Sequence, residues 1–250
     1  MDLELRGKRA IVTGGSRGIG KAVARELARE GASVVVVARD RATLEASARE
    51  LAAETGTEVT PITADTGSDE SVRAMVEAAA KALGGVDILV NAAAQPGGQA
   101  PPPKLAQIDD SVFWPDVNVK VMGYLRCIRE VAPVMAGTGG GRVVNISGLA
   151  ARSTGSTVGS IRNVAVAALT KALADELAAD GISLVVVHPG LTVTEKTPPD
   201  APPPPNVLLG RRPTAAEVAQ VVAFLASPKA IAINGDAIAV GGGTKGPIFY

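Results

Sequence analysis

This 250-residue sequence has few aromatic residues and a single cysteine. It has no excess of positive or negative charge. Its 25 basic residues balance 25 acidic ones, and no five like charges occur in a row. The chain therefore lacks the electrostatic footprint for binding nucleic acid or an anionic membrane surface, and we expect neither partner. The one cysteine, Cys127, excludes an internal disulfide and a metal site made of several cysteines. Because apolar residues surround it, we expect a buried structural thiol, and we expect no metal site.

Long apolar runs and a targeting signal are missing as well. No apolar run approaches the roughly 20 residues of a membrane-spanning helix. The N-terminal stretch MDLELRGKRAIVTGG lacks the basic flank and apolar stretch of a signal peptide. We therefore expect a cytoplasmic protein. Apolar residues make up 46% of the chain and charged residues 20%, which is the profile of a globular protein.

Short β-branched runs alternate with helical patterns along the chain. Helices are predicted, for example, over residues 19–30, over 40–54 with Asp40 as the N-cap, and over 214–226 behind a capping box. Apolar strands separated by helices imply a parallel sheet covered on both faces. We expect a doubly wound α/β fold in three layers, α/β/α, and one domain over residues 1–250. The predicted strands are 9–13, 33–38, 58–63, 87–90, 141–146, 183–187 and 237–240.

Two segments rich in proline and glycine, 92–104 and 197–207, do not fit this alternation. Each follows a predicted strand, so both should lie at the carboxyl edge of the sheet. They are either surface insertions or loops that cover a substrate, and the sequence leaves both interpretations open.

A glycine-rich turn stands between the first predicted strand and the first helix. The stretch IVTGGSRGIGKAVA places Gly14, Gly18 and Gly20 there. Glycines at this junction permit a tight turn, let the backbone approach a pyrophosphate and allow close packing of helix on strand. The N-terminus of the helix adds N–H donors for the phosphates. The turn predicts a dinucleotide site.

The wide spacing of these glycines, with Thr13 before them, resembles that of the short-chain dehydrogenase/reductase family. Further motifs extend the resemblance through nearly the whole chain, in the family's order. It implies a Rossmann fold, oxidoreductase activity on a small-molecule substrate, a nicotinamide dinucleotide and a homo-oligomer, either dimer or tetramer. The motifs are Asp65, NAAA at 91–94, Asn118 in DVNVKVMG, Ser147 in VVNISG, HPGLTVT at 188–194 and INGDAIAVGGG at 233–243.

The resemblance also implies which residues surround the cofactor. Asp65 and Asn91 would frame the adenine side, and residues 189–194 would hold the nicotinamide amide and the pyrophosphate. Asn163 would be a neutral ligand of the ribose. The complete predicted set is Gly14, Ser16, Arg17, Gly18, Ile19, Gly20, Arg39, Asp65, Thr66, Asn91, Asn163, Pro189, Gly190, Thr192 and Thr194.

The end of the second predicted strand bears on the choice between NADP and NAD. An NAD-selective site carries a carboxylate there, but this strand ends in Ala38 and then Arg39. A guanidinium suits a 2′-phosphate by charge and by forked hydrogen bonding, and Arg17 adds a second one. We therefore expect NADP, with NAD as the alternative. Both arginines could instead be solvated surface charges, and Asp40 could turn toward the ribose.

The family's reactive pair is missing from the sequence. In the family a tyrosine moves the substrate proton, a lysine four residues later lowers the pKa of that tyrosine, and a serine polarises the carbonyl. The tyrosine and lysine positions fall on Gly159 and Asn163. The only tyrosines are Tyr124 and Tyr250, and the latter could reach a neighbouring subunit's site. The sequence thus predicts a divergent member without the pair.

Three other residues are candidates for the chemistry. Ser147 stands at or beside the serine position, and His188 is the one side chain whose ordinary pKa suits acid–base work near neutral pH. Asn118 would adjust a helix and a proton-relay water, as the resemblance implies. Each also has a structural interpretation, as a strand-end serine, a satisfied histidine and a helix asparagine bonded to backbone.

Two functions are compatible with these observations. The first is an NADP(H)-dependent oxidoreductase that transfers hydride to or from a small carbonyl, alcohol or activated substrate and uses non-standard acid–base residues. The alternative is an inactive dinucleotide-binding protein that acts as a redox sensor or a partner subunit. Losing general acid–base catalysis slows a reaction about 10²–10⁴-fold, so a slow enzyme remains compatible with the missing pair.

Overall fold

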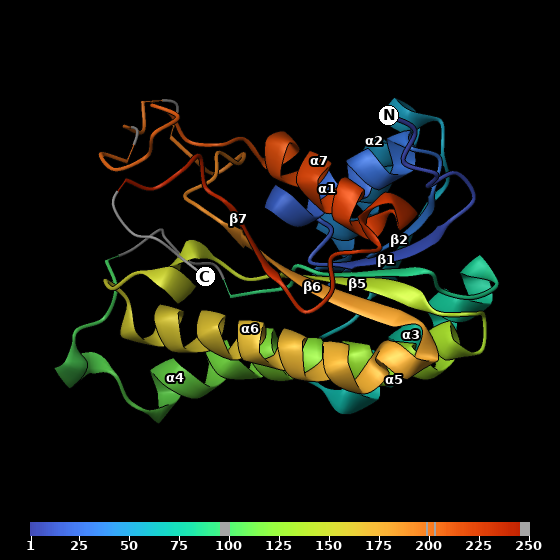
Figure 1. Ribbon diagram of the computed structural model, residues 1–250, viewed down its shortest axis with the longest axis horizontal. Coiled ribbons are helices and arrows are strands. Elements are labelled where there is room, and N and C mark those ends of the chain that lie inside the picture. The colour runs from blue at the N-terminus through green and yellow to red at the C-terminus, as the bar shows by residue number, and fades with distance from the viewer. Residues whose placement is uncertain (96–100, 199, 203, 246–250) are drawn as a thin grey trace.

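The computed structural model describes residues 1–95, 101–198, 200–202 and 204–245. Its strands form one parallel sheet in the order β3-β2-β1-β4-β5-β6-β7 (Figure 1). The predicted doubly wound parallel sheet is confirmed. The strands are β1 (Arg9–Thr13), β2 (Ser33–Ala38), β3 (Val59–Thr63), β4 (Ile88–Asn91), β5 (Gly141–Ile146), β6 (Ile182–Pro189) and β7 (Ala237–Val240).

Helices cover both faces of the sheet (Figure 1). One face carries α1 (Gly18–Arg29), α2 (Arg41–Thr55) and α7 (Ala215–Ala226), whose apolar residues share one buried cluster with β1 and β2. The other face carries the helices α3 (Asp69–Leu83), α5 (Gly123–Ala136) and α6 (Thr157–Leu177). The remaining helical segments are α4 (Asp110–Val117), the π-helical turn η2 (Asn118–Met122), and the short helices η1 (Leu105–Gln107), η3 (Leu149–Arg152), η4 (Ala178–Asp180) and η5 (Pro228–Ala230).

The composition of β2 explains why it lies inside the sheet. Val34 and Val36 belong to the cluster under α1, whereas Val35 and Val37 belong to the cluster under α3 and α5. Successive side chains of a strand point to opposite faces, so a run of valines is buried on both. Burying one such side chain contributes roughly 1.5–3 kcal/mol.

The helix signals in the sequence are also confirmed. Asp40 is the N-cap of α2 and accepts from the N–H of Thr43 over 2.8 Å. The capping box of α7 joins Thr214 and Glu217 in both directions. Cys127 is completely buried, and burial raises the pKa of its thiol to about 12, so it is the structural thiol that we expected.

The strand order reverses between β1 and β4, and in doubly wound sheets ligands bind outside the carboxyl ends of the strands at such a point. The N-termini of α1 and α6 lie at this edge (Figure 1). The segment after β6 does as well (Figure 1). Of the two predicted loops, residues 96–100, 199 and 203 lie outside the described residues. Within the described part of the chain, none of the helices has the length and hydropathy that crossing a bilayer would take.

Candidate active site

The glycine-rich turn between β1 and α1 is built on close approaches of backbone. Gly14 has a φ of +69°, and a Cβ placed on it would lie 2.7 Å from the carbonyl oxygen of Ala92. A Cβ on Gly20 would lie 2.3 Å from the oxygen of Gly14. Gly18 has a φ of +58°. Positive φ and close packing of the backbone therefore demand glycine at this turn, while Ile19 packs against the apolar cluster beside α1.

A carboxylate stands at the N-terminus of α1. The N–H of Gly18 donates to both carboxylate oxygens of Glu195, over 2.9 and 3.1 Å. Unpaired N–H groups and the helix dipole make this position attractive to an anion. Here the anion is the chain's own side chain. A cleft of about 540 Å³ opens beside it, lined in part by Ser16, Arg17, Lys21, Thr194 and Lys196.

At the end of β2 the two predicted arginines are exposed, and the carboxylate of Asp40 accepts a hydrogen bond from the next helix. Arg17 and Arg39 both present their side chains to solvent. Asp40 is bound to Thr43 as the cap of α2, and this hydrogen bond, together with the charge of Arg17, lowers the pKa of its carboxyl group. The carboxylate of Asp40 is therefore engaged as a helix cap, while both arginines face solvent.

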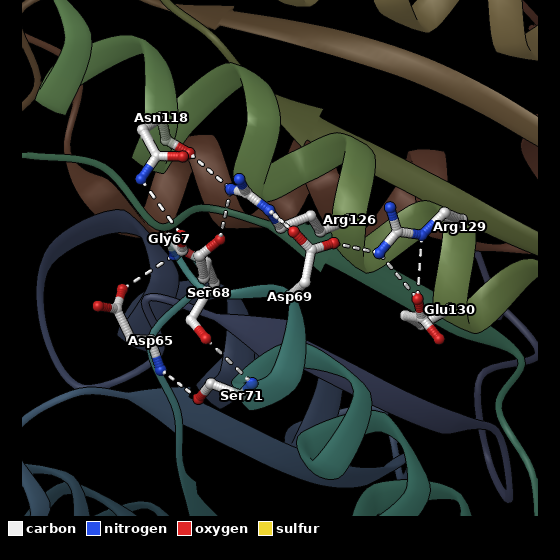
Figure 2. Close-up of polar contacts among 10 residues, drawn as sticks. Asp65, Gly67, Ser68, Asp69, Ser71, Asn118, Arg126, Arg129 and Glu130 are labelled. Carbon is white, nitrogen blue, oxygen red and sulfur yellow. Dashed lines mark hydrogen bonds and ion pairs between the residues drawn. The ribbon is translucent and has the colours of Figure 1, made fainter.

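The predicted adenine side is a polar network at the end of β3 (Figure 2). Asp65 accepts from the N–H of Gly67 over 2.9 Å, and the N–H of Asp65 donates to Ser71. The side chain of Asn118 donates to the oxygen of Gly67 over 3.2 Å. Thr66 is buried, and its carbonyl oxygen accepts from Arg126. Asn118 thus lies near Asp65. The hydrogen bond from its side chain to Gly67 holds the loop after β3.

Asn91 belongs to a buried ladder of amides and hydroxyls. Asn91 is completely buried, and its Nδ2 donates to Oδ1 of Asn145 over 3.0 Å. Nδ2 of Asn145 donates to the hydroxyl of Thr170 on α6 over 3.0 Å. At the other end the hydroxyl of Thr13 reaches Oδ1 of Asn91 over 3.5 Å. The side chain of Asn91 is therefore occupied inside the protein.

Ser147 and Asn163 come together where β5 ends against α6. The hydroxyl of Ser147 donates to the carbonyl oxygen of Asn163 over 3.0 Å. Asn163 is 3% exposed, and its Oδ1 is buried without a hydrogen-bond partner among the described residues. Gly159 lies one turn earlier, and its N–H donates to Ser156, the N-cap of α6. This corner thus holds polar groups around a position that has no side chain.

His188 lies at the end of β6 and is 2% exposed. Its Nδ1 is buried and finds no partner within the described residues. Burial lowers the pKa of His188 to about 4, and the positive charges of Arg152 and Lys120 add to the shift. Burial thus favours the neutral imidazole over the imidazolium at neutral pH.

Beyond His188 the chain turns away from the sheet. The strand ends at Pro189, and the N–H of Gly190 donates to Val240 in β7. The hydroxyl of Thr192 donates to the oxygen of Gly190 over 3.0 Å. A Cβ on Gly18 would lie 3.7 Å from the methyl group of Thr194. The segment predicted to hold the nicotinamide and the pyrophosphate therefore reaches the glycine-rich turn.

Two residues near this corner escaped the sequence analysis as site residues. The hydroxyl of Tyr124 donates to Ile146 over 2.9 Å, and burial raises its pKa, so this tyrosine is structural. Lys120 is 5% exposed, and its Nζ donates to the carbonyl oxygen of Ser147 over 2.8 Å. A lysine in a helical pattern ordinarily indicates a solvated face, and no feature of the sequence shows that this one points inward. Tyr250 lies outside the described residues.

A sequence model of the family described as "short chain dehydrogenase" matches residues 8–202. The chain belongs to the short-chain dehydrogenase family. Dehydrogenase/reductase SDR family member 4 of Oryctolagus cuniculus is 36% identical over 251 residues, covering 96% of this chain and 94% of the relative. The 3-oxoacyl-[acyl-carrier-protein] reductase of Pseudomonas aeruginosa is 34% identical over 248 residues, covering 96% and 98%.

A solved short-chain dehydrogenase structure has the same fold. The crystal structure of L-sorbose reductase from Gluconobacter frateurii, complexed with NADPH and L-sorbose, superposes with a TM-score of 0.90. The identity is 28%, and the match covers 99% of this chain and 100% of that one. The full-length superposition agrees with the strand order and the three layers described above.

Proposed function

We propose that this short-chain dehydrogenase is an NADP(H)-dependent oxidoreductase that transfers hydride between its cofactor and a small carbonyl or alcohol. It would do so without the family's tyrosine–lysine pair. The observation that carries the proposal is the crowded glycine turn at α1 combined with two exposed arginines at the end of β2, where Asp40 is bound as a helix cap. L-sorbose reductase, which shares the fold, was crystallised with NADPH.

The residues at the sheet edge fit a dinucleotide. Backbone atoms of Ala92 and Gly14 crowd Gly14 and Gly20 so closely that neither position has space for a Cβ, and such close packing of strand, turn and helix is what a tight phosphate-binding turn needs. The N–H of Gly18, now bonded to Glu195, would turn to the pyrophosphate. Arg17 and Arg39 would bind the 2′-phosphate. When bound, the cofactor supplies or accepts the hydride.

The substrate would lie at the corner bounded by Ser147, Gly159 and His188. The hydroxyl of Ser147 can exchange its bond to Asn163 for one to a substrate oxygen, which would polarise a carbonyl. At Gly159, where the family has a phenol, a Cβ would lie 2.6 Å from the hydroxyl oxygen of Ser156. Asn163, with its unpartnered Oδ1, offers an acceptor for a hydroxyl of the cofactor ribose.

Binding of NADPH and NADH, followed by nicotinamide fluorescence, tests the cofactor. We expect NADPH to bind about ten- to a hundredfold more tightly, because charge-assisted hydrogen bonds contribute roughly 1.5–3 kcal/mol. Arg39→Ala should remove about tenfold of the NADPH affinity and leave that for NADH unchanged. The exposed Arg49 of α2 provides the control, Arg49→Ala. Equal affinities, or an Arg39→Ala effect on both cofactors alike, would contradict the NADP preference.

Turnover separates the enzyme from the second candidate function. A screen of ketones, aldehydes and enones should find at least one compound that oxidises NADPH. Tight binding of NADPH with no oxidation of it by any compound would support a cofactor-binding sensor or partner subunit. The presence of Gly159 and Asn163 at the positions of the family's pair is the observation behind this second candidate. Absence of binding to either dinucleotide would overturn both.

A further inference from the structure

Lys120 is a buried basic residue beside the proposed substrate corner. The proposed function gives it no role. It belongs to η2, the π-helical turn that joins α4 to α5. The turn is closed by a bond from the N–H of Gly123 to the oxygen of Asn118. A π-helical turn holds one residue more than an α-helical one, and each residue rotates the helix by about 100°. The extra residue explains how a lysine inside an apparent helix can face the core.

The polar network in Figure 2 fixes this turn in place. The side chain of Asn118 donates to Gly67, and the oxygen of Asn118 accepts from Arg126 over 3.2 Å. Arg126 is in turn paired with Asp69 at the start of α3 over 3.1 Å. The backbone that carries Lys120 is therefore braced against the loop after β3. π-helical turns of this kind are frequent at functional sites.

The ammonium group reaches the end of β5. Nζ lies 2.8 Å from the oxygen of Ser147, whose hydroxyl is bound to Asn163. An ammonium group has three donors, and this bond uses one of them. Lys120 thus reaches the corner from η2, whereas Asn163 belongs to α6. By the family resemblance, Asn163 stands at the position of the family's lysine.

The charges around Lys120 do not neutralise it. Asp116 on α4 is already paired with Arg162 on α6. His188 on β6 is neutral, and the guanidinium of Arg126 on α5 is turned to the oxygen of Asn118. Among the residues that the structure describes, no carboxylate lies within ion-pair distance of Nζ. A buried ammonium without a paired carboxylate is costly, which makes a purely structural role a poor explanation.

Burial lowers the pKa of Lys120 to about 7, and Arg162 adds to the shift while Asp116 opposes it. The amine and the ammonium therefore coexist at neutral pH, which suits a group that gives and accepts protons. His188, with a pKa of about 4, lacks this property.

We propose that Lys120 is the acid–base residue of the reaction, and this rests on the function proposed above. In reduction the carbonyl carbon gains a hydride from the reduced nicotinamide, which becomes oxidised, and the carbonyl oxygen gains a proton from Nζ. The lysine is left as a neutral amine and regains its proton from solvent. In the oxidation direction the amine accepts the hydroxyl proton as the hydride leaves the carbon.

A stability measurement tests the proton on Lys120 without any turnover. Unfolded lysine keeps its proton up to a pH of about 10.5. Between pH 7 and 10 the unfolded chain therefore binds more protons than the folded one, so the free energy of unfolding should rise with pH. Lys120→Met should lack this rise. The matched control is Lys171→Met, because Lys171 lies exposed on α6 in a pair with Asp175, and it should retain the rise. Parallel curves for wild type and Lys120→Met would overturn the proposal.

Kinetics with any carbonyl found in the screen test the role. In wild type, kcat/KM for reduction should fall above a pH of about 7. Lys120→Met should lower kcat about 10²–10⁴-fold and remove the pH dependence, with NADPH affinity within about twofold of wild type. Lys120→Arg keeps the charge and the donor to Ser147 but cannot release a proton near pH 7, so it should be equally slow.

Two results would decide against Lys120, and they are distinguishable from failure of the proposed function. A Lys120→Arg variant with wild-type rate and pH profile would show that charge and hydrogen bonding suffice, which is a structural role. Rapid turnover by Lys120→Met would show that the reaction needs neither the proton nor the charge of Lys120. A wild-type protein that binds NADPH yet reduces no carbonyl would instead overturn the oxidoreductase itself, and the role of Lys120 with it.

Discussion

The structure is held in different ways at the start of α1 and at the start of α6. At α1 the shape comes from backbone, since Gly14 and Gly20 bring main-chain atoms into contact that any Cβ would disrupt. At α6 the shape comes from side chains: Lys120 donates to the carbonyl oxygen of Ser147, and the hydroxyl of Ser147 donates to the carbonyl oxygen of Asn163. A backbone cradle depends on glycine, whereas a side-chain corner can change its residues and keep its fold. Substitutions should therefore be tolerated more readily at the start of α6 than at the glycine turn.

The largest effect is expected where the backbone cradle is broken. Gly14→Ala would place a Cβ 2.7 Å from the oxygen of Ala92 at a φ of +69°. We expect about a 1000-fold loss of NADPH affinity in a fluorescence titration, because backbone strain of about 1–3 kcal/mol adds to displaced phosphate donors. Gly56→Ala is the matched control, because Gly56 has the same φ of +69° but open space around it.

The control should lose about 1 kcal/mol of stability in denaturant and keep its affinity for NADPH. A Gly14→Ala variant that binds as tightly as Gly56→Ala does would show that crowding at this turn is unimportant to the cofactor.

A smaller effect tests the side-chain corner through pH. His188 has a pKa of about 4 in the folded protein, against about 6.5 in the unfolded chain. Between these values the unfolded chain binds more protons, so stability should be lost as the pH falls from 6.5 to 4, by about 3 kcal/mol. Denaturant unfolding of wild type and His188→Asn across this range isolates the contribution. Curves that run parallel would mean that His188 titrates in the folded protein as it does in the unfolded one.

The smallest effect is expected at Glu195, which occupies the donor of Gly18. A pyrophosphate and this carboxylate compete for one N–H and repel each other. Glu195→Gln should therefore tighten NADPH binding about two- to fivefold, since a charge at a helix N-terminus is worth about 0.3–1 kcal/mol. Glu176→Gln, on the exposed side of α6, should change nothing. Weaker binding by Glu195→Gln would instead make the carboxylate a cofactor ligand.

The sheet was predictable because its strands are continuous apolar runs. The predicted ranges 9–13, 33–38, 141–146 and 237–240 coincide with β1, β2, β5 and β7. Other ends moved by one or two residues, as with β6, which was predicted over 183–187 and spans Ile182–Pro189. The helix caps were predictable because they depend on local sequence. Asp40 and Thr214 each accept a hydrogen bond from the backbone N–H three residues later.

The corner at α6 was predictable only in part. Ser147 and Asn163 were placed by resemblance, and the structure brings them together. Lys120 was missed because its direction depends on a single extra residue in η2, which apolar periodicity cannot register. The isolation of His188 was also invisible, because its lowered pKa comes from burial and from the charges of Arg152 and Lys120, which lie far from it in sequence.

The ladder from Thr13 through Asn91 and Asn145 to Thr170 crosses three central strands and ends on α6. Sliding β4 by one residue would turn Asn91 to the other face and leave the amide of Asn145 without its partner, at about 1–3 kcal/mol for each orphaned group. Valine runs alone would tolerate such a slip. The ladder therefore favours one alignment of β1, β4 and β5, and it is complete only when α6 has packed against them.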